Sequence, residues 1–80
     1  MKSNDVQRLL DRLCSYMGFC LPPFEQERLV AHPPDSVKDF TDAVFVAEGF
    51  DLLTVDLHLY RQVREVIAEA FQQANDQESM

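Results

Sequence analysis

Apolar residues recur every three or four positions in three stretches of the chain, which is the spacing of one face of an α-helix. The first stretch, residues 5–17, has its apolar positions at Val6, Leu9, Leu10, Leu13, Cys14 and Met17. The second, residues 36–48, has them at Val37, Phe40, Val44 and Ala47. The third, residues 56–73, has them at Leu59, Tyr60, Val63, Ile67, Ala70 and Phe71, and the stripe continues to Ala74. No stretch alternates apolar and polar residues as a strand does, so the pattern predicts an all-α protein.

Glycine and proline mark the ends of these helices. The only two glycines, Gly18 and Gly49, each follow an apolar stripe, and each is followed by a phenylalanine. Glycine accepts the left-handed conformation that ends many helices, so we expect two similar hydrophobic C-caps. Pro23 suits the first turn of a further helix over residues 23–31, which lacks one clean apolar stripe. The expected architecture is a small bundle of three to four helices.

The chain length bounds the organisation of the protein. Eighty residues fit one domain, which we place at residues 1–74, with a polar tail over residues 75–80 that should fray. A core of this size seldom supplies more than ~3–5 kcal/mol, so a second copy or a partner that covers leftover apolar surface would add stability. A homodimer is one such arrangement.

The charge balance indicates the kind of partner. Fourteen acidic residues against seven basic ones give a net charge of −7, and the basic residues are scattered. This balance disfavours binding to nucleic acid and to anionic membranes and favours a protein partner with a basic surface. The chain also lacks the apolar run of a signal peptide or a membrane span, so we expect a cytoplasmic protein.

The cysteines and histidines do not form a recognisable catalytic or metal-binding motif. Cys14 and Cys20 are separated by five residues, which matches neither a redox Cys-x-x-Cys nor a zinc knuckle, and we expect two reduced thiols. Neither His32 nor His58 has a ligand partner two to four residues away. No nucleophile, base and oxyanion site can be assembled either, so we expect no enzymatic activity, no metal and no cofactor.

Residues 35–46 carry the candidate partner-binding residues. Asp35, Asp39 and Asp42 stand at steps of four and three and so share one side of the predicted helix with Val46. We call these four residues the acidic third-helix face. On a helical wheel of this segment, Phe45 lies on the flank between the apolar stripe and the acidic third-helix face. An apolar spot rimmed by acids is typical of a docking surface, whereas the alternative is that another helix or subunit simply covers Val46.

The segment Asp35-Ser36-Val37, followed by Glu48 and Phe50-Asp51, resembles the Asp-Ser-Leu region of acyl carrier proteins, over about seventeen residues. Those are small acidic four-helix domains whose serine carries a phosphopantetheine arm, and the resemblance implies Ser36 as the attachment point. The chain departs from that pattern at Pro33 and Pro34, where carriers have glycine and a small or apolar residue. Ser36 is also, without any resemblance, a residue type preferred as a helix N-cap.

Three hypotheses of function follow. The first is a non-catalytic acidic interaction module that binds a protein partner through the acidic third-helix face. The second is the acyl-carrier-like protein, and the third is an acidic inhibitor of a basic partner, as small helical immunity proteins are.

Overall fold

The computed structural model describes the backbone of residues 2–78 and the side chains of residues 2–74. Four helices make up this part of the chain, and they are α1 (Ser3–Met17), α2 (Pro23–Ala31), α3 (Val37–Ala47) and α4 (Leu57–Glu78). No residue within 2–78 is in a strand, so the predicted all-α bundle is confirmed. The helix over residues 23–31 is present at the bounds that Pro23 suggested.

The last helix is longer than its apolar stripe predicts. It continues to Glu78, whereas the stripe ends at Ala74 and the predicted helix ended at residue 73. The residues added by this extension, 75–78, are all polar in the sequence. The predicted frayed tail stays a prediction, and its residues 79–80 lie outside the described part of the chain.

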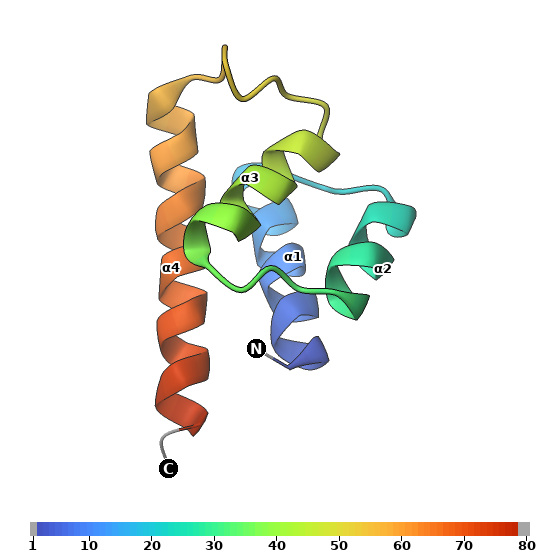
Figure 1. Ribbon diagram of the computed structural model, residues 1–80, viewed down its shortest axis with the longest axis vertical. Coiled ribbons are helices and arrows are strands. Elements are labelled where there is room, and N and C mark those ends of the chain that lie inside the picture. The colour runs from blue at the N-terminus through green and yellow to red at the C-terminus, as the bar shows by residue number, and fades with distance from the viewer. Residues whose placement is uncertain (1, 79–80) are drawn as a thin grey trace.

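The helices are arranged around α1, which lies between α4 and α2 (Figure 1). The main contacts join α3 to α4, α1 to α4 and α1 to α2. The start of α1 and the end of α4 lie at one end of the molecule, and the segment 48–56 crosses the opposite end between α3 and α4 (Figure 1). The molecule measures 40 × 26 × 22 Å, with α4 along its length.

One core receives side chains from all four helices. Its fully buried members come from α1, α3 and α4, while Leu29 is the buried residue of α2. The predicted stripes account for most of the core, but Phe45 was wrongly placed on a flank and is completely buried. The helical wheel of α3 alone placed the buried side on Val37, Phe40, Val44 and Ala47. In the fold the buried arc is rotated toward Phe45, because α3 packs between α4 and the Phe19 segment.

Both glycines end their helices in the left-handed conformation, as predicted. Gly18 has φ 73° and Gly49 has φ 90°. At the second, the Gly49 N–H donates to the Val46 carbonyl (3.0 Å) and the Phe50 N–H donates to the Phe45 carbonyl (2.9 Å), which is the Schellman pattern.

The phenylalanines that follow the two glycines pack against each other. The Phe19 and Phe50 rings stack with centroids 5.7 Å apart and planes within 5°. Phe45 contacts both rings edge-on, at 5.1 and 5.4 Å, and stacks on Tyr60 at 5.4 Å. We call Phe19, Phe45, Phe50 and Tyr60 the aromatic cluster. It ties the end of α1 to the end of α3 and the start of α4.

Candidate interaction surface

The acidic third-helix face is only partly assembled by the fold. Asp39 and Val46 lie on α3 and are exposed, Val46 at 59%. Asp35 is exposed too, but it precedes the N-cap residue and is not part of the helix. Asp42 is half-buried and already holds two partners. Of the four predicted residues, only Asp39 and Val46 therefore both lie on α3 and are exposed to solvent.

Asp42 links α3 to α4, and it also bonds to Lys38 one turn earlier in α3. One carboxylate oxygen accepts from the Tyr60 hydroxyl (2.7 Å) and the other accepts from the Lys38 ammonium (2.8 Å). These two donors hold the pKa of Asp42 below its usual value, against an opposing contribution from burial. The pKa of Tyr60 is raised, first by burial and then by the bond to Asp42. The carboxylate is thus ionised and committed to the fold at neutral pH.

The connection between α3 and α4 is an ordered turn organised by two aspartates. The Asp51 carboxylate accepts from the Leu53 N–H (2.9 Å), and the Asp51 carbonyl accepts from the Thr54 N–H (3.0 Å). The Asp56 carboxylate accepts from the His58 N–H (2.9 Å), so it caps the start of α4. Both acids therefore fix the backbone of the segment that carries the exposed leucines.

This turn and the first residue of α4 carry the most exposed leucines near the acidic residues. Leu53 is 93% exposed, Leu57 is 70% exposed, and Leu52 is partly exposed. A groove of about 270 Å³ lies beside them and is lined by Lys38, Asp42, Leu52, Val55, Leu57 and Tyr60. We call Leu52, Leu53 and Leu57 together with this groove the loop surface. Large aliphatic side chains that are exposed to solvent on an ordered backbone are typical of a protein-binding site.

Sequence reasoning missed the loop surface because it sought apolar residues at helical spacing. The signal was present in the run from Phe50 to Leu57, which has five apolar residues and no helical period. A turn normally consists of polar residues, so such a run between two helices either enters the core or remains exposed. Here Phe50 joins the aromatic cluster while the leucines stay outside.

Ser36 has a structural role that its position predicts. It is the N-cap of α3, where its side-chain oxygen accepts from the Asp39 N–H (3.1 Å). The side chain is exposed, and Asp35 beside it makes no capping bond. Capping accounts for serine at this position. Attachment of a phosphopantetheine arm stays a prediction.

Cys14 and Cys20 form a disulfide, so the expectation of two reduced thiols is wrong. The spacing alone gave no indication, because a helix separates residues six apart. Gly18 reverses the chain just after α1 and brings the two Cα atoms within 4.3 Å. The oxidised sulfurs are not available as ligands, and no group of three or more potential metal ligands is gathered among the described side chains, residues 2–74.

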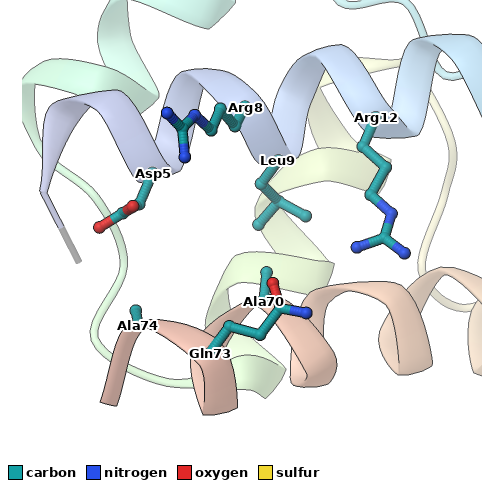
Figure 2. Close-up of a pocket in the computed structure, with 7 residues that line it drawn as sticks. All are labelled: Asp5, Arg8, Leu9, Arg12, Ala70, Gln73 and Ala74. Atoms are coloured by element: carbon teal, nitrogen blue, oxygen red, sulfur yellow. The ribbon is translucent and has the colours of Figure 1, made fainter. Parts of the chain in front are cut away.

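A pocket of about 250 Å³ lies between α1 and α4 (Figure 2). Leu9, Ala70 and Ala74 form its apolar wall, Arg12 extends from α1 toward α4, and Arg8 and Gln73 also line the pocket (Figure 2). Arg12 pairs with Glu69 across the helices at 3.5 Å, and Asp5 stands at the rim. The charge of Arg12 is therefore balanced by Glu69. The pocket holds neither a nucleophile nor a paired base.

Glu48 is a charged residue in an unfavourable environment. It stands at the C-terminal end of α3, where the helix dipole disfavours a negative charge, and its Oε1 atom is buried with no hydrogen-bond partner among the described residues. Burial raises the pKa of Glu48. The folded protein thus holds a proton here more tightly than the unfolded chain does.

The Glu48→Gln variant should accordingly be more stable than the wild type at neutral pH, by about 0.5–1 kcal/mol. The contribution of Glu48 to stability is fully present below the ordinary glutamate pKa and is lost as the pH rises through the higher folded pKa. Urea unfolding across this range should show the advantage of the variant shrinking as the pH falls. Glu65→Gln, on the exposed side of α4, is the matched control. A Glu48→Gln variant less stable than wild type at neutral pH would contradict the prediction.

None of the helices within residues 2–78 has the length and apolar character required to cross a membrane. Comparison with protein-family models, with curated proteins and with solved structures finds no match. The function is therefore inferred from the geometry and charge of this chain.

Proposed function

We propose that the protein is a non-catalytic interaction module that binds a basic, partly apolar segment of another protein at the loop surface. The observation that carries this proposal is the exposure of Leu53 on the turn and of Leu57 at the start of α4, where Asp51 and Asp56 hold the backbone. A preorganised apolar contact costs less entropy on binding than a flexible one does. The groove beside the leucines offers a recess for one side chain of the partner.

The charge around the loop surface favours a basic partner. From Asp35 to Asp56 the chain has six acidic residues and one basic residue, Lys38. Lys38 is paired with Asp42, so it does not offset the exposed Asp51 and Asp56. Opposite charges on a partner would speed association and select against other proteins.

A second copy of the chain fits this surface less well. A symmetric dimer through the loop surface would bring Asp51 and Asp56 of both chains together, and like charges in an interface cost free energy. We therefore commit to a different protein as the occupant. Self-association is an outcome that the experiment below detects.

The proposal modifies the expectation made from the sequence. Asp42 now forms part of the groove through its bond to Tyr60, and Val46 lies one helical turn beyond it. Asp39 extends the acidic character along α3, whereas Asp35 lies apart from the helix. The carrier and inhibitor hypotheses, and the cytoplasmic location, stay predictions.

The test begins with a photoreactive amino acid at position 53, and with the same probe at position 72 on the exposed side of α4 as a control. Proteins crosslinked only from position 53 are then purified, and their affinity is measured by calorimetry. Leu53→Ser/Leu57→Ser should weaken binding at least about tenfold, because exposed apolar anchors at the centre of an interface carry much of its free energy. Added salt should weaken it further.

The matched control is Tyr16→Ser/Phe24→Ser, which removes side chains of comparable exposure from α1 and α2. Equal loss of affinity in both double variants would contradict the loop surface as the binding site. Crosslinks from position 53 to a second copy alone would contradict the choice of occupant.

A further inference from the structure

The Cys14–Cys20 disulfide encloses the residue that connects α1 to the aromatic cluster. The bond closes a short ring that includes the Gly18 turn and Phe19. Phe19 is 6% exposed and stacks on Phe50, which begins the segment that leads to the loop surface. A direct path of packed atoms therefore runs from the disulfide through Phe19 and Phe50 to that segment.

We propose that this disulfide is a reversible latch that controls the loop surface. In the oxidised protein it holds Phe19 against Phe50 and so fixes the start of the turn that carries Leu53 and leads to Leu57 at the start of α4. When a dithiol reductant opens the bond, Phe19 is freer to leave the aromatic cluster, and the turn loses the packing of Phe50 on Phe19. Binding at the loop surface then weakens. This regulation rests on the function proposed above.

The chemistry is ordinary thiol–disulfide exchange. A thiolate of the reductant attacks Cys20 Sγ, the Cys14–Cys20 bond breaks, and Cys14 leaves as a thiolate that takes up a proton. The second thiolate of the reductant then attacks its own sulfur in the mixed disulfide and releases Cys20, which is protonated in turn. The reductant ends as a disulfide, and the protein ends with two thiols.

The positions of the two sulfurs suit a bond that opens without unfolding the protein. Cys20 is exposed, so its sulfur can be reached by an attacking thiolate, whereas Cys14 is half-buried on α1. The hydrogen bonds that end α1, from the Gly18 N–H to the Cys14 carbonyl (3.2 Å) and from the Phe19 N–H to the Leu13 carbonyl (3.1 Å), do not depend on the sulfurs. The buried residues of α1 up to Leu13, and those of α3 and α4, lie outside the ring.

The opening of the latch can be measured without any partner. Amide hydrogen exchange is followed by NMR in oxidised protein and in protein reduced with dithiothreitol. The Phe50 N–H, bonded to the Phe45 carbonyl, should exchange on the order of tenfold faster after reduction. The increase should exceed that of the Val63 N–H in the buried part of α4, which reports opening of the core. Leu53 and Leu57 methyl signals should shift as well.

The Phe50→Leu variant tests whether the effect of the disulfide reaches the turn through the contact between Phe19 and Phe50. It removes the stack on Phe19 at a half-exposed position, so reduction should still speed exchange at Phe19 but no longer shift the Leu53 methyl signals. Three results would overturn the latch. They are two free thiols in air-oxidised protein, reduction that changes Phe19 but leaves Phe50 and Leu53 unchanged, and complete unfolding on reduction, which would make the bond a permanent structural link.

The latch and the proposed function fail in different ways. A partner that binds oxidised and reduced protein equally, through Leu53 and Leu57, would overturn the latch and support the function. A loop surface that responds to reduction but binds no partner would support the conformational part of the latch and contradict the function.

Discussion

Phe45→Ala is expected to lower the free energy of unfolding by about 3–5 kcal/mol, which is comparable to the whole stability that a core of this size supplies. Phe45 is completely buried, and its ring contacts those of Phe19, Phe50 and Tyr60 at 5.1–5.4 Å. Alanine leaves a cavity where three segments of the chain meet. The variant should therefore be largely unfolded at room temperature.

Circular dichroism during urea unfolding measures this effect. Phe24→Ala is the matched control, because it makes the same chemical change at a side chain that is 69% exposed on α2. The control should lie within about 0.5 kcal/mol of wild type. Similar unfolding midpoints for the two variants would show that the aromatic cluster is not the centre of the core.

The Cys14→Ser/Cys20→Ser variant is expected to lose about 2 kcal/mol of stability. Removing the crosslink restores the freedom of a short loop to the unfolded chain, and the entropy model for a ring of this length gives that magnitude. For a domain of this size the midpoint of thermal unfolding should fall by roughly 8–16 °C. The variant should remain folded at low temperature, as the latch requires.

Thermal unfolding of wild type with and without dithiothreitol provides the control. Reduced wild type should match the double serine variant, and the reductant should leave the variant itself unchanged. A wild-type midpoint that does not move on reduction would mean that the bond does not stabilise the fold.

The hydrophobic pattern was enough to predict the helices, because three of them are amphipathic and their ends carry glycine, proline or a capping residue. The α2 segment was the least clear, since Leu29 is its only buried residue and a single contact leaves no stripe. Ser36 was correctly identified as a capping residue, because capping depends on neighbours within a few positions.

The candidate site was harder to predict than the fold. The helical wheel placed Asp42 on the solvent-exposed side of its helix. A helical wheel describes one helix and does not include the Tyr60 hydroxyl, which donates to Asp42 from α4. Phe45 was assigned to a flank for the same reason. The leucines of the α3–α4 turn were overlooked because their exposure depends on how the two helices are placed.

The sequence by itself determined the helical class, the two glycine-phenylalanine helix ends and the excess of acid in the middle of the chain. These features depend on local conformation and on composition, which neighbouring residues define. Only the tertiary structure decided that the two phenylalanines stack on each other, that Cys14 and Cys20 are joined, and that Leu53 and Leu57 remain in water. Each of these depends on the distance between side chains of different segments, and that distance is fixed only when the helices pack.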